Sequence, residues 1–388
     1  MNTEKEFEKI QDEIIKLRHT IHENPELSFE EHETTKLIRS FCINCGLYII
    51  DIGMPTGVAA YLDCGCKTTV ALRCDIDALS AEPCAFNGYK SAAHNCGHDF
   101  HTASLLACVK IMSQNKSAAK NNILFIFQPA EEVTNGAQKM LDCGLLSALP
   151  SKPAAVFGIH NRPEIPLGKV AVHKGALMAA KTNFIIDITG KAGHGGQPHE
   201  CIDPIVCSAA VISAVQTVVS RNTNPLDACV CTICSVHGGT TDNQAPESVR
   251  MTGSIRALDK RVIDRCRERL TDITVSTSKA FMCKNVIEFI PQVPPVYNSE
   301  KMYDFALKCA QSAFGGDGIT DTAPVLGSED FAVFGEHIPS FFYWVGSGSA
   351  DRPCTPWHSS NFTVDDDYLL YAAKLYVSLC CTEYNGNT

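Results

Sequence analysis

The chain has 388 residues and a formal net charge of −10, from 33 Lys and Arg against 43 Asp and Glu. One hydrophobic core rarely serves more than about 250–300 residues, so we expect two domains. The acidic balance and the lack of a Lys/Arg run argue against nucleic acid and against an anionic membrane surface as partners, and favour small molecules.

Apolar residues make up 45% of the chain and are spread along it, without the long apolar span that a transmembrane helix needs. Residues 1–18 are charged and helix-forming and lack the apolar segment of a secretory signal, which predicts a cytoplasmic protein. Cysteine is unusually frequent, with 20 residues. In a reducing compartment most of these thiols should be free and buried.

Two cysteine groupings invite a metal or redox interpretation: Cys42-x-x-Cys45 and Cys229-x-Cys231-x-x-Cys234. The first lies at the end of a helical pattern, and the second lies in a strand-like run where Cys229 and Cys231 share a face. Neither has a partner pair at zinc-ribbon spacing. We therefore interpret both as core packing.

The first part of the chain alternates helices and strands. Hydrophobic periodicity predicts helices over 3–22, 30–45, 102–113 and 135–146, and strands over 48–52, 58–62, 69–74, 123–127 and 154–159. Three of the strands deliver polar side chains at their ends: Asp75 and Asp77, then Glu131 and Glu132, then His160. Such strand ends favour a mostly parallel sheet with a site along one edge.

The pattern changes near residue 181. Strands over 182–189, 229–237, 248–257 and 285–290 and helices over 204–219 and 260–279 follow in the order βαββαβ, which is typical of a ferredoxin-like domain. The remainder predicts helices over 299–315, 329–336 and 365–380 and a strand over 340–345. The fold class is therefore α/β, with a catalytic domain formed by 1–180 and 291–388 and an inserted domain at 181–290.

A dense polar motif precedes the helix predicted at 102–113. Residues 94–101 contain one thiol, three imidazoles and a carboxylate. Thiolate and imidazole suit zinc and its first-row neighbours, and Cys96 and His98 can reach one centre together because Gly97 permits a tight turn between them. Asp99 could hold a ligand ring from behind.

Five candidate metal ligands can be collected from separate segments: Cys96, His98, Glu132, His160 and His358, with Glu131, Asp75 and Asp77 beside them. Five donors exceed one tetrahedral site, whereas two metals sharing an anionic ligand would use them all. Adjacent glutamates in an extended chain face opposite ways, so one could bind metal while the other serves as general base. This division of labour suits hydrolysis.

The sequence resembles the aminoacylase and carboxypeptidase G type metallohydrolases, in the branch of hippurate hydrolases, N-acyl amino acid amidohydrolases and auxin-conjugate hydrolases. The resemblance covers nearly the whole chain. Its motifs are Arg18-x-x-Ile21-His22-x-x-Pro25-Glu26, Arg73-Cys74-Asp75-Ile76-Asp77-Ala78-Leu79, His94-Asn95-Cys96-Gly97-His98-Asp99, Gln128-Pro129-Ala130-Glu131-Glu132, Gly158-Ile159-His160, Gly193-His194-Gly195-Gly196, Gly327-Ser328-Glu329-Asp330-Phe331 and His358-Ser359.

The resemblance implies a site with two divalent ions. The expected ions are zinc or manganese, with cobalt or nickel as alternatives, and the implied ligands are Cys96 as the bridge, His98, Glu132, His160 and His358. By the same resemblance Glu131 is the catalytic acid and base, and Asp77 orients a ligand histidine. Residues 181–290 would be a lid that also forms a homodimer and brings His194 to the substrate, with Asn243 and Arg256 contributing polar contacts.

The implied activity is hydrolysis of N-acyl amino acids, with acetyl or aryl-acyl groups, to a carboxylate and a free amino acid. A dipeptidase or carboxypeptidase acting on short peptides is one alternative, and a thiol-rich metal-storage protein is another. Three departures from the family pattern leave specificity open: Ser80 replaces a usual Pro, Asn95 replaces a common Ala, and the loop from Glu82 to Ala93 is short.

Overall fold

A computed structural model describes residues 1–80, 92–149, 151–290, 293–349 and 354–386. The chain divides into two units. Unit 1 comprises Met1–Gly175, Tyr297–Ala323 and Asp330–Thr388, and unit 2 comprises Ala176–Val296 and Pro324–Glu329. Most of the short loop noted at Glu82–Ala93 lies outside the described residues; its last two residues form β5 (Ala92–Ala93), which pairs with β4 (Leu79–Ser80).

Unit 1 is built on one large sheet. Its strands lie in the order β1 (Tyr48–Ile50), β2 (Val58–Leu62), β6 (Asn122–Gln128), β3 (Thr69–Asp75), β7 (Ala155–Pro166), β18 (Ser340–Gly348), β8 (Val170–Ala171) and β17 (Ile319–Thr320). The neighbours β6, β3, β7 and β18 run parallel, as predicted from their continuous apolar sequences. The mostly parallel α/β fold is thereby confirmed.

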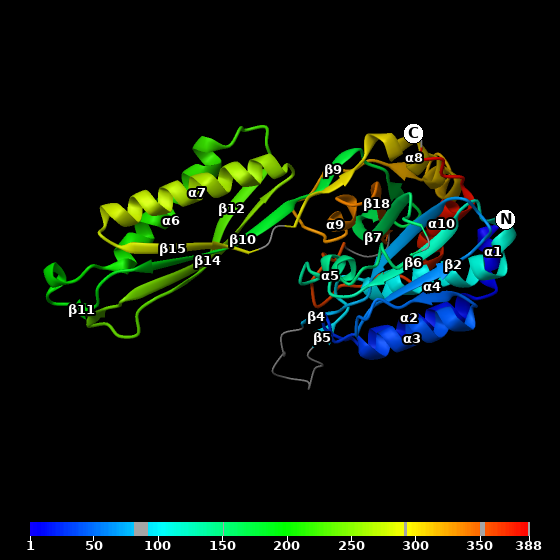
Figure 1. Ribbon diagram of the computed structural model, residues 1–388, viewed down its shortest axis with the longest axis horizontal. Helices are drawn as coiled ribbons and strands as arrows, with labels where there is room; N and C mark the ends of the chain where they lie inside the picture. Colours follow the sequence, from blue (N-terminus) through cyan, green and yellow to red (C-terminus); the bar gives the residue numbers. More distant parts are fainter. Residues whose placement is uncertain (81–91, 150, 291–292, 350–353, 387–388) are drawn as a thin grey trace. The chain divides into compact units, whose positions relative to one another are not determined.

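Helices cover both faces of this sheet (Figure 1). They are α1 (Thr3–Glu8), α2 (Gln11–Glu23), α3 (His32–Asn44), α4 (His98–Gln114), α5 (Gly136–Asp142), α8 (Glu300–Phe314), α9 (Ala332–Gly335) and α10 (Tyr368–Cys381), with a 3-10 turn at Lys116–Ala118. Alternate residues of β18 show the two-sided burial: Phe341 and Tyr343 belong to the core that includes α8 and α10, whereas Phe342 packs against Phe331 with ring centroids 5.0 Å apart.

Two predictions for unit 1 were wrong in detail. The single helix predicted over 3–22 is interrupted at Lys9 and Ile10, where the Ile10 N–H donates to the Phe7 carbonyl at 2.9 Å in a tighter turn than that of an α-helix. The strand predicted over 154–159 continues as β7 to Pro166, so His160 lies within the strand instead of following it.

Unit 2 contains a four-stranded antiparallel sheet in the order β12 (Cys229–His237), β14 (Ser248–Ala257), β10 (Ala180–Thr189) and β15 (Lys284–Phe289). The helices α6 (Pro204–Asn222) and α7 (Lys260–Ala280) cover one face (Figure 1). This arrangement confirms the predicted βαββαβ domain. Shorter elements of unit 2 are β11 (Gly193–His194), β13 (Gln244–Ala245) and a 3-10 turn at Pro198–Glu200, whereas β9 (Gly175–Met178) and β16 (Val296–Asn298) contain residues of both units.

Helix α6 is long and apolar enough to cross a membrane by length and composition. One such helix is weak support for a span, because core helices of soluble proteins pass the same test. Its residues Cys207, Val211, Val215 and Val218 recur at helical spacing and are completely buried in the unit 2 core. We therefore interpret α6 as a core helix.

The cysteines that the structure describes are all free thiols. Cys42 and Cys231 are buried in the cores of units 1 and 2. The interpretation of Cys234 as core packing was wrong: this residue is exposed, at a bulge where the register between β12 and β14 shifts between Ile233 and Ser235.

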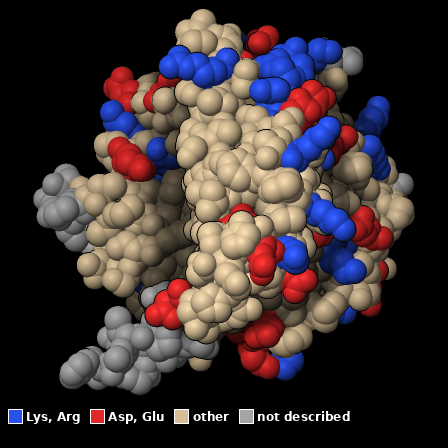
Figure 2. All heavy atoms as spheres, turned by 90° about the vertical axis from the view of Figure 1, so that its left-hand side faces the viewer, with Lys and Arg blue, Asp and Glu red and all other residues tan. Residues whose placement is uncertain are grey.

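Acidic and basic side chains are interspersed on the face shown in Figure 2. Along α7, for example, Arg267 lies 3.6 Å from Asp264 and Arg269 lies 3.2 Å from Asp272. Such exposed pairs contribute little to stability, typically about 0–1 kcal/mol each.

A buried ionic network fixes the carboxyl end of β3. The Arg73 guanidinium donates to Asp75 Oδ2 at 2.9 Å, to Gln128 Oε1 at 2.8 Å and to Asp330 Oδ1 at 3.2 Å, and these side chains are fully buried. Asp330 also accepts from the Ala137 backbone N–H at 3.0 Å. The network therefore ties β3, β6 and the start of α5 together.

We expect Arg73→Met to lower the unfolding free energy of unit 1 by about 3–5 kcal/mol, because it leaves two carboxylates buried without their cation. Arg250→Met is a suitable control, since Arg250 also makes a two-pronged contact with one carboxylate, Asp187, but is largely exposed. Urea unfolding followed by circular dichroism compares the two. If both substitutions lowered the unfolding free energy by the same small amount, the stabilising role of the buried network would be contradicted.

Candidate metal centre

The five predicted ligands lie together in unit 1, although they come from separate segments. Cys96 and His98 stand at the start of α4, Glu132 in a turn after β6, His160 within β7, and His358 between β18 and α10. Three pairs of donor atoms are close: Cys96 Sγ and His160 Nε2 at 3.5 Å, His98 Nε2 and Glu132 Oε1 at 3.7 Å, and His358 Nε2 and Glu132 Oε2 at 3.7 Å. Two ligands of one tetrahedral ion at about 2.0–2.3 Å lie at comparable separations.

Two of these donor atoms lack any hydrogen-bond partner. His98 Nε2 and Glu132 Oε1 are buried and unpaired. Leaving such atoms unpaired costs about 1–3 kcal/mol each, and a bound cation removes that cost. The residues present therefore fit a metal ion at this position.

Burial sets the protonation of the ligands in the metal-free protein. It raises the pKa of the Cys96 thiol well above its ordinary value and that of the Glu132 carboxyl to about 7. It also lowers the pKa of His160 and His358, which keeps both imidazoles neutral, the form that binds metal. The pKa of His98 is raised because, although burial opposes it, the Asp75 carboxylate and the Cys96 thiol favour its charged form.

Asp77 holds two of the ligand segments. Its Oδ1 lies 3.3 Å from His98 Nδ1, and its Oδ2 accepts from the Glu132 backbone N–H at 3.0 Å and from the Ser28 hydroxyl at 2.7 Å. Although burial raises the pKa of the Asp77 carboxyl, the hydrogen bonds from His98, Ser28 and Glu132 outweigh it and hold this pKa below its ordinary value. An ionised Asp77 orients His98 so that Nε2 faces Glu132.

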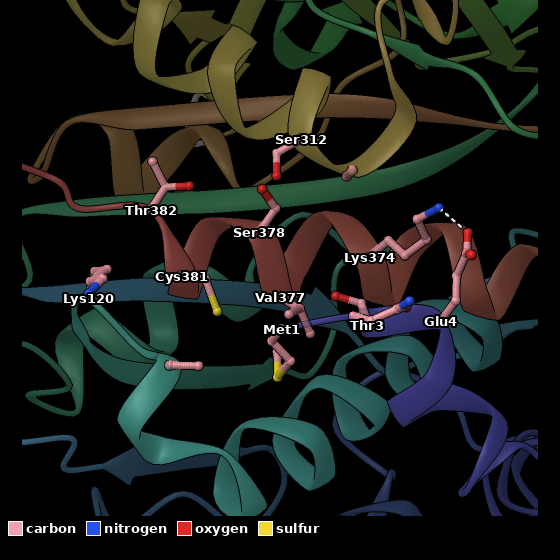
Figure 3. A pocket seen from close by; sticks show the side chains of 13 residues that line it. Met1, Thr3, Glu4, Lys120, Ser312, Lys374, Val377, Ser378, Cys381 and Thr382 are labelled. Carbon is pink, nitrogen blue, oxygen red and sulfur yellow. Dashed lines mark hydrogen bonds and ion pairs between the residues drawn. The ribbon is translucent and has the colours of Figure 1, made fainter.

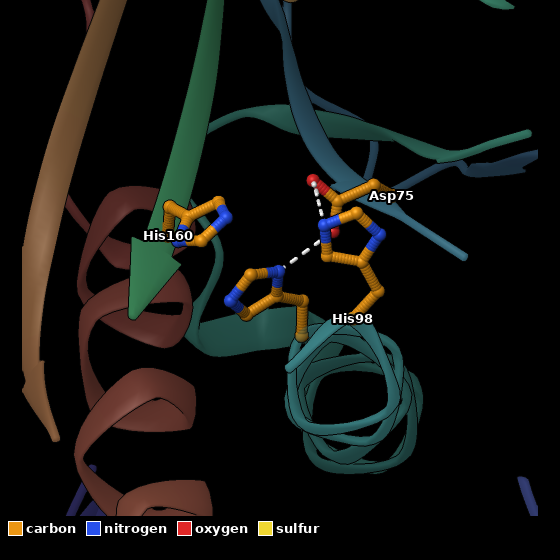
Figure 4. Close-up of side chains that lie close together, drawn as sticks. Asp75, His98 and His160 are labelled. Carbon is orange, nitrogen blue, oxygen red and sulfur yellow. Dashed lines mark hydrogen bonds and ion pairs between the residues drawn. The ribbon is translucent and has the colours of Figure 1, made fainter. Parts of the chain in front are cut away.

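Asp75 forms a buried pair with His101 next to the predicted ligands, and this pairing was not predicted. Figure 4 shows Asp75, His98 and His160 converging from β3, α4 and β7. His101 Nδ1 lies 2.6 Å from Asp75 Oδ1, and His101 Nε2 accepts from the Asn161 backbone N–H at 3.0 Å. Because both ring nitrogens of His101 are engaged, it is not available as a ligand.

Glu131 is buried, and its neighbour Ala130 has a left-handed backbone with φ of +56°. The segment is a turn and not the extended chain assumed from sequence. His358 is also left-handed, with φ of +63°, and its N–H is held by the Asn95 carbonyl at 2.8 Å. Residues other than glycine adopt this conformation at a cost, and such residues are concentrated at functional sites.

Glu31 holds the turn that carries Glu131. Its Oε1 accepts from the Ala130 backbone N–H at 2.9 Å, whereas Oε2 is buried without a partner. Burial raises the pKa of Glu31 to about 7. This residue was missed from sequence, because a glutamate between two helices usually indicates a solvated surface.

The other predicted site residues belong to unit 2. His194 is exposed on β11, and the backbone N–H of Gly195 donates to the Asn243 carbonyl at 2.8 Å, so His194 and Asn243 lie near each other. Arg256 lies on β14, where it donates to the Leu326 carbonyl at 3.0 Å. Partial burial lowers the pKa of its guanidinium.

A cavity of about 550 Å³ lies elsewhere in unit 1 (Figure 3). It is lined by residues of α1, α8 and α10 and carries the ion pair between Glu4 and Lys374, at 2.6 Å. None of the candidate metal-centre residues lines it.

Thiol, imidazole and carboxylate donors gathered beside a parallel sheet, with a buried glutamate next to them, define a metallohydrolase. Comparison with known proteins shows the family of metallohydrolases to which the chain belongs. Residues 71–382 match Peptidase family M20/M25/M40, and the chain belongs to this family. The resemblance inferred from sequence is thereby confirmed.

Two relatives and one solved structure illustrate the similarity. The chain is 35% identical to the N-acetylcysteine deacetylase of Bacillus subtilis (strain 168), covering 94% of this chain and 95% of that one. It is 35% identical to IAA-amino acid hydrolase ILR1-like 2 of Arabidopsis thaliana, covering 95% and 84%. A Bacillus subtilis dinuclear metal binding peptidase of the M20 family has 30% identity and a TM-score of 0.82, covering 96% and 98%.

The raised pKa of Glu31 predicts a pH-dependent difference in stability. Because its pKa is 4.5 in a reference state and about 7 when folded, the folded protein binds the extra proton, and its stability falls as pH rises from 4.5 to 7. Glu31→Gln keeps an acceptor for Ala130 and lacks this titration. Its stability relative to wild type should therefore increase between pH 5 and pH 8, by on the order of 3 kcal/mol at most.

Urea unfolding of chelator-treated protein at both pH values measures this difference. Glu30→Gln is the matched control, since Glu30 is the exposed neighbour of Glu31 and should leave stability within about 0.5 kcal/mol. A stability difference between Glu31→Gln and wild type that does not change with pH would show that Glu31 is not held protonated.

Proposed function

We propose that the protein is an N-acyl amino acid amidohydrolase with two divalent metal ions, which cleaves acetyl or aryl-acyl amino acids to a carboxylate and a free amino acid. The observation that carries this proposal is the donor cluster around Cys96, with its unpaired His98 Nε2 and Glu132 Oε1. The names of the relatives, an N-acetylcysteine deacetylase and a hydrolase of IAA-amino acids, support the substrate class.

In this proposal Cys96, His98, Glu132, His160 and His358 would hold the two ions, with Cys96 as the ligand that they share. Zinc and manganese are the favoured ions, and cobalt and nickel fit the same donors. Bound ions would supply Lewis-acid polarisation of the acyl oxygen and a more acidic water. Asp77 keeps His98 and Glu132 oriented through its two oxygens.

Glu131 moves the proton. Its carboxylate accepts a proton from the attacking water as the water oxygen bonds to the acyl carbon. When the bond between carbon and nitrogen breaks, Glu131 returns that proton to the leaving amine. His194 of unit 2 would donate a hydrogen bond to the developing oxyanion, with Asn243 and Arg256 contacting other polar groups of the substrate.

Two further proposals concern the role of unit 2 and the cellular compartment of the protein. Residues 181–290 would form a lid and a homodimer contact, supported by large apolar side chains exposed on unit 2, among them Ile205, Val206 and Val236. The free thiols of the described cysteines support a reducing compartment such as the cytoplasm.

A peptidase acting on short peptides is the second candidate function. It is favoured by the family description and by the solved dinuclear metal binding peptidase. The two candidates differ in the substrate amine, which is acylated for the amidohydrolase and free for a dipeptidase.

Glu131→Gln should bind the same number of metal ions as wild type and lose turnover by on the order of 100-fold or more, because the amide cannot carry the proton. Amine release from N-acetyl and N-benzoyl amino acids and from free dipeptides measures the loss and separates the two candidates. The exposed Glu13→Gln serves as control. Cleavage of free dipeptides alone would move the assignment to peptidase.

Cys96→Ala should reduce the bound metal below two ions per chain, because the shared ligand is lost. Cys108→Ala is a matched control, since Cys108 is a buried thiol on the same helix whose sulfur contacts Cys380 at 3.8 Å. Elemental analysis after dialysis gives the metal content. Two ions retained by Cys96→Ala, or many thiol-bound ions in wild type, would contradict the proposed site.

A further inference from the structure

Asn161 is a completely buried side chain that follows His160 on β7. It takes part in neither the predicted ligand set nor the proton transfer. Nevertheless its polar groups form hydrogen bonds with three parts of the predicted site: the start of α4, the segment that carries His358, and His160 itself.

The first contacts are with the start of α4. Asn161 Nδ2 donates to the Cys96 backbone carbonyl at 2.6 Å. Both Nδ2 and the backbone N–H of Asn161 lie 3.0 Å from His101 Nε2, which accepts because the other ring nitrogen of His101 faces Asp75. The amide therefore holds the Cys96 backbone and the Asp75 and His101 pair at a fixed separation.

The second contacts are with the segment that carries His358. Asn161 Oδ1 accepts from Trp357 Nε1 at 3.0 Å and from the Ser347 hydroxyl at 3.4 Å. The Trp357 ring also packs edge-on against His160, with centroids 5.2 Å apart. Since Trp357 directly precedes His358, its anchoring limits where the His358 imidazole can lie.

The third contact is with His160 itself. The backbone carbonyl of Asn161 accepts from His160 Nδ1 at 2.8 Å, which leaves Nε2 directed at Cys96 Sγ. Space around the amide is tight as well. A Cβ on Gly97 would lie 2.5 Å from Asn161 Nδ2, and Gly97 has φ of +92°, so only glycine allows this approach.

We propose that Asn161 is a positioning residue that sets the spacing of Cys96, His160 and His358 for metal binding. The inference rests on the proposed metal site. An amide is required because one end must donate to a carbonyl and a ring nitrogen while the other accepts from Trp357. Aspartate has the same shape and offers only oxygens, so Asn161→Asp places an acceptor 2.6 Å from the Cys96 carbonyl.

The test uses cobalt, whose thiolate charge-transfer absorption reports on a metal bound to cysteine sulfur. Metal-free wild type, Asn161→Asp and Asn298→Asp are titrated with cobalt(II) and followed by that absorption. Asn298 is the matched control: it is also fully buried in unit 1, where it donates to the Phe342 carbonyl at 2.9 Å, and its partners include none of the ligands. Outer contacts of this kind typically change metal affinity by about 10–100-fold.

We expect Asn161→Asp to need about 10–100-fold more cobalt than wild type, while Asn298→Asp titrates like wild type. An Asn161→Asp titration that matches wild type would overturn the proposal. If wild type itself gave no charge-transfer band, the metal site and the role of Asn161 would both be overturned.

Trp357→Phe provides a second test should Asn161→Asp not fold by circular dichroism. This variant keeps an aromatic ring beside His160 and removes the donor to Asn161 Oδ1 together with part of the ring that stacks on Trp344. We expect weaker binding of cobalt with an unchanged unfolding temperature. Unchanged cobalt affinity in Trp357→Phe would overturn the proposed anchoring of the His358 segment.

Discussion

Many titratable groups are buried at one edge of the unit 1 sheet, among them Arg73, Asp75, His98, His101 and Asp330, and their need for partners governs how the surrounding segments are placed. Removing carboxylates and imidazoles from water is costly unless each finds a partner. The positive charge of Arg73 compensates the negative charges of Asp75 and Asp330, and Asp75 in turn forms a hydrogen bond with His101. Among the buried atoms left without a hydrogen bond are His98 Nε2 and Glu132 Oε1, which a metal ion would complete. The same few side chains therefore contribute both to the packing of unit 1 and to the chemistry of the candidate metal site.

This arrangement also couples metal binding to protons. In the metal-free protein burial raises the pKa of the Cys96 thiol well above its ordinary value and that of the Glu132 carboxyl to about 7, whereas it lowers the pKa of His160 and keeps that imidazole neutral. Ligation of a cation requires the thiolate and the carboxylate, so protons must be released on binding and the affinity for metal must fall as the pH falls. Ala130 and His358 both have a left-handed backbone, which is strained in residues other than glycine. Each is held by a hydrogen bond to a distant segment: the Ala130 N–H donates to the Glu31 side chain, and the His358 N–H donates to the Asn95 carbonyl.

Much of this could be predicted from the sequence, for physical reasons. Continuous apolar strands such as 69–74 and 123–127 specify a buried parallel sheet, and βαββαβ periodicity specifies the second unit. Cys96 and His98 could be proposed as ligands because thiol and imidazole are concentrated in residues 94–101, whereas the full ligand set was implied by the resemblance to the family. By contrast, Glu31, Asn161 and His101 act through contacts across 60 or more residues of sequence, which no local pattern encodes.

We propose that one thiolate, that of Cys96, joins two metal ions in this centre. Anomalous diffraction from crystals of the manganese-loaded protein, collected near the manganese absorption edge, tests this bridge directly. We expect two anomalous peaks, both within bonding distance of Cys96 Sγ, with His98, Glu132, His160 and His358 as the other protein ligands. A single peak, or two peaks of which neither contacts Cys96, would contradict it.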